Sequence, residues 1–235
     1  MDARLLKELN AERARRRAAI LVTDLADGNA RLVREGDRVE GAFGDALRAA
    51  FRSGKSGSVE VDGRSLFLNV HLPPPRFVII GAVHISQALA PMARLAGLDV
   101  TIIDPRTAFA TPDRFPDVDL LAEWPQDVLP DRPLDAYTAL AALTHDPKID
   151  DIPLKAALDS GCFYVGALGS RKTHAKRNER LQAAGATAEQ LARINAPIGL
   201  DIGAASPAEI AVAVLGAVIS ALRSRDLREQ EARAA

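Results

Sequence analysis

The hydrophobic and polar positions along the chain follow two different patterns, and the first covers about 73 residues. Here short apolar runs are separated by tight turns, as in Ala18 to Thr23, which is followed by Asp27-Gly28-Asn29. Asp62-Gly63 suits the positive φ angles of a hairpin turn between two further runs. The expected elements are helices at 4–17 and 42–52 and strands at 18–23, 29–35, 58–61 and 65–71. Residues 1–73 are therefore predicted to form a small α+β domain.

Three consecutive prolines, Pro73 to Pro75, separate this part from the second pattern, because proline cannot donate to a sheet. Apolar runs then alternate with helical spacings, which predicts a parallel sheet. The expected strands are 77–80, 100–103, 118–121, 137–143 and 162–165, and the expected helices are 86–95, 152–158, 173–184 and 210–222. Residues 76–225 are thus predicted to form a Rossmann-like α/β domain, with a charged tail that frays after Ser224.

Two helix starts are marked by capping boxes, in which a hydroxyl and a side chain three residues later satisfy unpaired backbone amides. Thr187 with Gln190 fits this pattern, and so does Ser206 with Glu209. Pro207 stands at the first helical position, where its missing N–H costs nothing. The helix that follows is apolar on most sides, so we expect it to pack against the sheet or a partner.

The composition limits the class of protein. Thirty basic residues face thirty-one acidic ones, so the net charge of -1 gives no general attraction to nucleic acid or anionic membranes. Cys162 is the only cysteine, which excludes an intrachain disulfide and a zinc site built on several thiolates. The N-terminal residues lack a signal-like apolar stretch, and no run of ~18 apolar residues predicts a membrane span. A cytoplasmic protein without a metal site is expected.

The first candidate site is the turn Gly81-Ala82-Val83-His84 after the strand at 77–80. A strand, a glycine turn and a helix start present N–H groups to a pyrophosphate, and an acidic residue about 20 positions on binds ribose. Asp104 stands at that distance. Val83 occupies the place of the second fingerprint glycine, so cofactor binding and a purely structural glycine turn are both open interpretations.

The second candidate is Thr144-His145-Asp146, directly after an apolar strand. Ligands bind at the carboxyl ends of strands in open α/β sheets. His145 could act as an acid, a base or a ligand, with Asp146 near enough to raise its pKa. The alternative is an Asx-type turn with an exposed histidine.

The third candidate is the loop Gly169-Ser170-Arg171-Lys172, which lies between a strand and a helix. Glycine, a capping serine and two adjacent cations favour an anion such as phosphate. In the alternative interpretation the cations form a solvated helix face, made of Arg171, Lys172, Lys176, Arg177 and Arg180.

The fourth candidate is the apolar loop around Gly199 and Asp201, where two glycines flank one aspartate. Asp201 would either orient a ligand or cap a turn. Cys162 is interpreted as a buried small apolar residue rather than a nucleophile.

These segments, in this order, resemble the XdhC/CoxI family, whose members assist the maturation of xanthine dehydrogenases and related molybdenum hydroxylases. The resemblance runs from about Phe77 to Leu222. It is carried by GAVHIS with DVTIIDPR, by LTHD, by YVGALGSRKTHAKR and by ARINAPIGLDIGAASPAEIAVAVL.

The resemblance implies a carrier without catalytic residues that binds the molybdenum cofactor (molybdopterin), protects it during sulfuration by a cysteine desulfurase, and delivers it to an apo-enzyme. Gly169 to Lys172 would hold phosphate, and Gly81 with Asp104 would line the same crevice. Family members usually carry Gly-Ala-Gly-His where this chain has Val83. Two other hypotheses stay open: an NAD(P)-dependent oxidoreductase with His145 as acid or base, and a protein-binding module without a ligand. A homodimer is expected only as the commonest state of such proteins.

Overall fold

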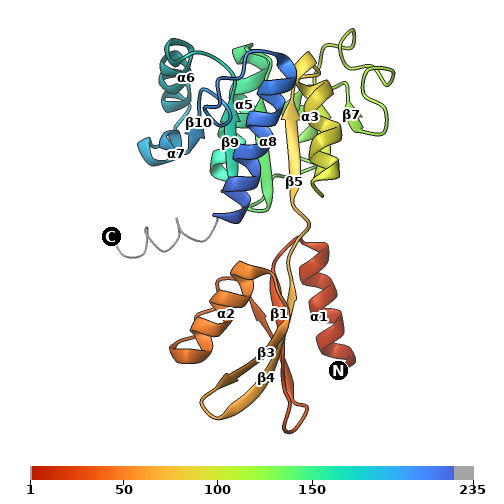
Figure 1. Cartoon of the computed structure of the whole chain (residues 1–235), viewed down its shortest axis with the longest axis vertical. Coiled ribbons are helices and arrows are strands. Elements are labelled where there is room, and N and C mark those ends of the chain that lie inside the picture. Colours follow the sequence, from red (N-terminus) through yellow and green to blue (C-terminus); the bar gives the residue numbers. More distant parts are fainter. Residues whose placement is uncertain (1, 225–235) are drawn as a thin grey trace. The chain divides into compact units, whose positions relative to one another are not determined.

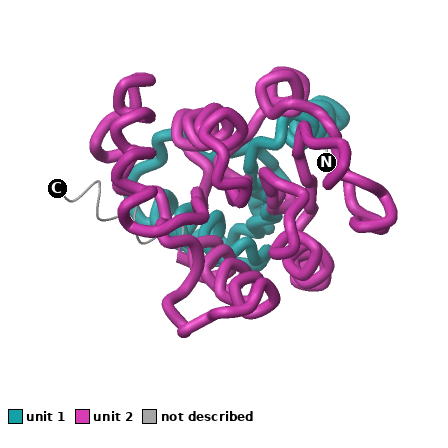
Figure 2. The backbone as a smooth tube through the Cα atoms, turned by 90° about the horizontal axis from the view of Figure 1, so that it is seen from above, with its two compact units in different colours: residues 1–73 teal, residues 74–235 magenta. Residues whose placement is uncertain are grey.

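The computed structural model describes residues 2–224, and the chain divides between Pro73 and Pro74 into two compact units (Figure 2). Each unit has its own sheet and its own hydrophobic core. The charged tail predicted after Ser224 lies outside the described residues.

The first unit is built on an antiparallel sheet with the strand order β2-β1-β4-β3. Leu47 and Ala50 of a helix pack on one face of this sheet, against Ile20 and Leu68. Its elements are α1 (Ala3–Ala14), β1 (Ala19–Asp24), β2 (Ala30–Arg34), α2 (Gly41–Ser53), β3 (Gly57–Val61) and β4 (Arg64–His71).

The second unit contains a parallel sheet in the order β10-β9-β8-β5-β6-β7. This is the order of a doubly wound Rossmann fold, in which the chain turns outward in both directions from the two central strands. The strands are β5 (Arg76–Ile80), β6 (Asp99–Ile103), β7 (Asp119–Leu121), β8 (Thr138–Ala142), β9 (Tyr164–Ala167) and β10 (Ile194–Asn195). The point where the strand order reverses lies between β5 and β8.

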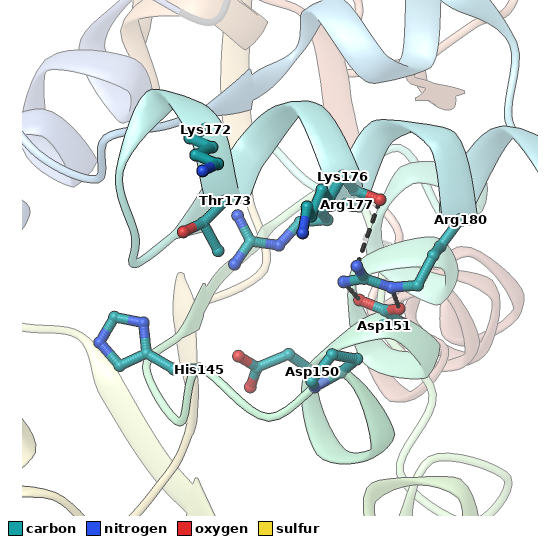
Figure 3. A pocket seen from close by; sticks show the side chains of 9 residues that line it. His145, Asp150, Asp151, Lys172, Thr173, Lys176, Arg177 and Arg180 are labelled. Atoms are coloured by element: carbon teal, nitrogen blue, oxygen red, sulfur yellow. Dashed lines mark hydrogen bonds and ion pairs between the residues drawn. The ribbon is translucent and has the colours of Figure 1, made fainter.

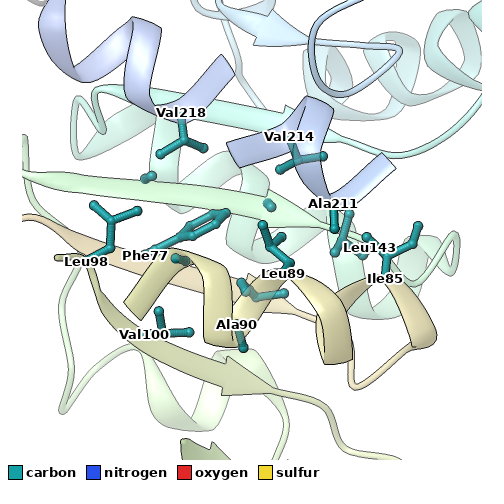
Figure 4. Packing of buried hydrophobic residues seen from close by; sticks show 14 of the residues in the cluster. Phe77, Ile85, Leu89, Ala90, Leu98, Val100, Leu143, Ala211, Val214 and Val218 are labelled. Carbon is teal, nitrogen blue, oxygen red and sulfur yellow. The ribbon is translucent and has the colours of Figure 1, made fainter. Parts of the chain in front are cut away.

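Helices cover both faces of this sheet, because alternate residues of each strand point to opposite sides. Phe77 and Ile79 of β5 pack under α3 (His84–Leu95) and α8 (Pro207–Arg223), which lie side by side (Figures 1 and 4). Val78 and Ile80 pack on the other face under α5 (Pro147–Asp159). The remaining helices are α4 (Pro125–Val128), α6 (Arg171–Ala183) and α7 (Ala188–Ala192).

The predicted fold class is confirmed, and so are both capping boxes, at the starts of α7 and α8. The predicted start of α5 at Ile152 is wrong: the helix begins five residues earlier, with Pro147 in its first turn and Asp146 as its N-cap. The short elements α4 and β10 were not predicted. Among residues 2–224 no helix is long and apolar enough to cross a membrane.

Candidate functional site

The carboxyl ends of β5 and β8 meet where Gly81 lies against Thr144. A Cβ on Gly81 would come within 2.9 Å of Thr144 Cγ2, and the φ angle of Gly81 is 117°. A residue with a side chain would be strained and crowded there, which explains the glycine. The first and second predicted sites therefore share one edge of the sheet.

Thr144 also organises the start of α5. Its hydroxyl accepts from the Asp146 N–H at 3.0 Å and donates to Asp150 Oδ1 at 2.7 Å. The Asp146 carboxylate accepts from the Lys148 N–H at 2.9 Å and caps the helix, so the Asx-type turn describes this segment. His145 is exposed between them, with a left-handed φ of 64°.

The loop before α6 prepares a second helix start beside the first. Gly169 has a φ of 132°, and the Ser170 hydroxyl accepts from the Thr173 N–H at 3.3 Å, as a capping serine does. Arg171 and Lys172 follow, both exposed. Further along α6, Arg177 is only 2% exposed and donates through Nη2 to the carbonyl of Leu168 at 2.8 Å.

Between α5 and α6 lies a pocket of about 300 Å³ (Figure 3). The Asp150 carboxylate and the Arg177 guanidinium both point into the space between the helices, with His145 on the side opposite the Arg180–Asp151 pair. The lining residues are His145, Pro147, Asp150, Asp151, Lys172, Thr173, Lys176, Arg177 and Arg180.

The charges of this pocket differ in how they are compensated. Arg180 donates to both oxygens of Asp151, at 2.5 and 3.0 Å, so these two charges neutralise each other. Burial raises the pKa of Asp150 to about 6, although the Thr144 hydrogen bond and the Arg177 charge act in the opposite direction. Burial also lowers the pKa of Arg177. Lys172 and Lys176 are exposed at the pocket and leave it with an excess of positive charge.

The structure separates Asp104 from this pocket. Its side chain is fully buried, and its oxygens accept from the Ala82 N–H at 2.7 Å and from Arg106 Nε and Nη2 at 2.9 and 2.7 Å. Burial acts to raise the pKa of Asp104, but these hydrogen bonds hold it below its ordinary value. Asp104 and Ala82 are therefore engaged with the protein itself, at the place where a dinucleotide fold presents free groups to ribose and pyrophosphate.

The remaining predicted residues also lie elsewhere. Val83 is the N-cap of α3 and packs against the core, while His84 is exposed. A Cβ on Gly199 would come within 2.9 Å of the α8 backbone, so this glycine permits close packing of the loop, and Asp201 is exposed. Arg171 is not among the residues that line the pocket.

Sequence reasoning missed Asp150 and placed Arg177 on a solvated face, which is wrong. Arg177 lies four residues before Leu181, and these are the two buried residues of α6. Asp150 lies four residues before the buried Leu154 of α5. A charged residue in register with a buried helix stripe was the available signal in both cases.

Cys162 is fully buried, as predicted, and burial raises the pKa of its thiol to about 12. Among residues 2–224, no group of three or more His, Cys, Asp or Glu side chains is arranged to hold a metal ion. The pocket is therefore suited to an organic anion held by cationic side chains.

Comparison with known proteins gives matches over the second unit and over the fold. Residues 77–218 match the model of the XdhC Rossmann domain. The chain is 30% identical over 156 residues to a probable xanthine dehydrogenase subunit of Bacillus subtilis (strain 168), which covers 66% of this chain and 45% of that protein. It is 31% identical over 148 residues to the "Molybdenum cofactor insertion chaperone PaoD" of Escherichia coli (strain K12), covering 63% and 40%. It thus spans less than half the length of either relative.

A solved structure of a xanthine dehydrogenase from Bacillus halodurans has the same fold, with a TM-score of 0.62 and 23% sequence identity. The match covers 94% of this chain and 63% of that chain. At this identity the likeness shows the fold, and it extends over both units.

Proposed function

Because the chain belongs to the XdhC family, we propose that it binds the molybdenum cofactor as cargo and assists its insertion into a molybdenum hydroxylase apo-enzyme. The observation that carries the proposal is the cationic pocket between α5 and α6, at the carboxyl edge of the Rossmann sheet. Ligands of doubly wound folds bind at this edge. The name of the PaoD relative describes the same task.

The residues of the pocket fit a cargo with a phosphate group. Lys172 and Lys176 stand beside the start of α6, where Gly169 and Ser170 turn the chain into the helix. A helix start and ammonium groups both favour phosphate. Arg177 contributes two buried nitrogens, Nε and Nη1, that have no hydrogen-bond partner among the described residues. A volume of about 300 Å³ lies at the lower end of the range for small-molecule sites.

We extend the proposal to the sulfuration step, in which a cysteine desulfurase would supply sulfur to the bound cargo. Cys162 cannot be the sulfur carrier, because it is fully buried and its thiol stays protonated at neutral pH. Within these 235 residues it is the only cysteine. The desulfurase would therefore pass sulfur to the cargo directly, while this chain holds and shields it.

The test is calorimetric titration with anaerobically prepared molybdenum cofactor. Wild type should bind it, and Lys172→Ala/Lys176→Ala should weaken binding by about tenfold, because two cation–phosphate contacts are lost. Lys148→Ala/Lys55→Ala removes two exposed lysines outside the pocket and should bind like wild type. Cofactor binding that is unaffected by the pocket substitutions would refute this site.

A second measurement addresses delivery. Loaded protein is mixed with an apo-molybdenum hydroxylase, and the activity restored is compared with that restored by the free cofactor. Faster or more complete activation by the loaded protein is expected. The size of the loaded protein in solution, measured by light scattering, tests whether the carrier is a homodimer.

A further inference from the structure

Two buried polar groups in the pocket are incompletely paired. Asp150 is 1% exposed, and its Oδ1 accepts from the Thr144 hydroxyl, whereas Oδ2 has no partner among residues 2–224. Arg177 is 2% exposed, and its Nε and Nη1 also have no partner among these residues. Buried polar atoms are nearly always paired in folded proteins. Three unpaired atoms on two neighbouring side chains indicate that a ligand completes them.

The two groups do not complete each other. Their charges interact, since Arg177 opposes the burial-induced rise in the pKa of Asp150. Yet the Asp150 Oδ2 and the two free nitrogens of Arg177 stay without hydrogen bonds in the described part of the chain. The pocket therefore presents an acceptor and a pair of donors to the same space (Figure 3).

A phosphate does not match this pair. The Arg177 nitrogens would attract it, but the Asp150 carboxylate would repel it, and the two are part of one pocket. The lysines at the start of α6 offer cations without a carboxylate of this kind beside them. A neutral group that carries both an N–H and a carbonyl oxygen matches the acceptor and the donors together.

We propose that Asp150 and Arg177 recognise the edge of a 2-amino-4-oxopyrimidine ring. Asp150 Oδ2 accepts from the ring N–H or 2-amino group, and Arg177 donates to the 4-oxo oxygen. This inference rests on the proposed function, because the pterin of the molybdenum cofactor carries such an edge. The guanine of a nucleotide tail carries the same edge, so the chemistry has two sources. The phosphate then lies toward Lys172 and Lys176.

The experiment uses ring probes on the full chain. Neopterin has the 2-amino-4-oxo edge, and lumazine carries an oxo group where neopterin has the 2-amino group. Wild type should bind neopterin about tenfold or more tightly than lumazine, because the second oxo group faces Asp150 and cannot donate to it. This comparison needs no variant. Equal binding of the two probes would overturn the inference.

Two variants locate the effect. Asp150→Asn should weaken neopterin binding by about tenfold to a hundredfold and abolish the preference over lumazine. Asp151→Asn removes the same charge from the next residue of the same helix, whose carboxylate is already paired with Arg180, and should retain the preference. Circular dichroism checks that both variants fold. A preference that survives Asp150→Asn would overturn the inference.

The remaining arms separate the sources and the two proposals. Preference for GMP over neopterin, lost in Asp150→Asn, would support the same edge and assign it to guanine. If wild type binds the molybdenum cofactor and Asp150→Asn binds it equally well, the ring inference fails while the proposed function stands. If wild type does not bind the cofactor but shows Asp150-dependent neopterin binding, the proposed function fails and the ring inference stands.

Discussion

Gly81 and Thr144 close the central seam of the Rossmann sheet: a Cβ on Gly81 would lie 2.9 Å from the methyl carbon of Thr144. The two residues follow β5 and β8, the strands at which the strand order reverses. The seam also supports the pocket, since the Thr144 hydroxyl hydrogen-bonds the buried Asp150.

Gly81→Ala should therefore destabilise the protein by about 2 kcal/mol or more, through an unfavourable left-handed φ and through the contact with Thr144. The free energy of unfolding in urea measures this loss. Gly97→Ala is the matched control, since Gly97 also has a positive φ, 82°, but a Cβ there meets open space. Equal losses in the two variants would show that the Thr144 contact costs nothing.

A nicotinamide dinucleotide should not bind tightly, and we expect a dissociation constant for NADH or NADPH weaker than about 1 mM. In a dinucleotide fold the acidic residue after the second strand binds ribose hydroxyls. Here Asp104 already accepts from Arg106 and from the Ala82 N–H. Titration followed by nicotinamide fluorescence tests this. Micromolar NADH binding that is lost in Asp104→Asn would favour the oxidoreductase hypothesis instead.

The parallel sheet could be predicted because buried strands of such a sheet are continuous apolar runs, and residues 77–80 and 100–103 are of this kind. The helix starts at Thr187 and Ser206 were equally clear, since a capping box is a local arrangement that needs no tertiary context. The early start of α5 was missed because Pro147 and Pro153 both interrupt a helical pattern, although proline is compatible with a first turn.

The pocket was predicted only in part. Thr144, His145 and Lys172 were selected because they follow strands or precede a helix, which are local features. Asp150 and Arg177 were not, because charged residues on helices usually face solvent. Their burial arises from the packing of α5 beside α6, which sequence spacing alone does not define. Asp104 had the expected spacing, but its engagement with Arg106, two residues later, is visible only in the structure.

The cap of α8 should contribute measurably to stability, because α8 covers one face of the sheet with α3. The Ser206 hydroxyl accepts from the Glu209 N–H at 3.2 Å, and Glu209 accepts from the Ser206 N–H at 2.9 Å. Ser206→Ala should lower the free energy of unfolding by about 1 kcal/mol. Ser220→Ala makes the same change at an exposed position within the helix and should be neutral or slightly stabilising. Similar effects of the two substitutions would contradict a role for the cap.

Asp150 should make the protein less stable as the pH rises from about 4 to about 6. The pKa of Asp150 is raised from its ordinary value of 3.8 to about 6 in the folded protein, mainly by burial. Below both values the carboxyl is protonated in the folded and unfolded states, and the native state is not penalised. Between them the unfolded chain releases the proton while the folded chain keeps it, so stability falls. Above pH 6 the loss is complete.

Each pKa unit corresponds to about 1.4 kcal/mol, so the loss attributable to Asp150 is about 3 kcal/mol. Urea unfolding at pH 4 and pH 7 measures it, and Asp150→Asn should lose about that much less stability between the two pH values than wild type does. Asp113→Asn, at an exposed position, should follow wild type. The variant should also be the more stable protein at pH 7, because it no longer buries an ionised carboxylate. A wild type and an Asp150→Asn variant with parallel pH profiles would mean that the Asp150 carboxyl is solvated in the folded state, and the pocket would then lack the buried acceptor on which ring recognition depends.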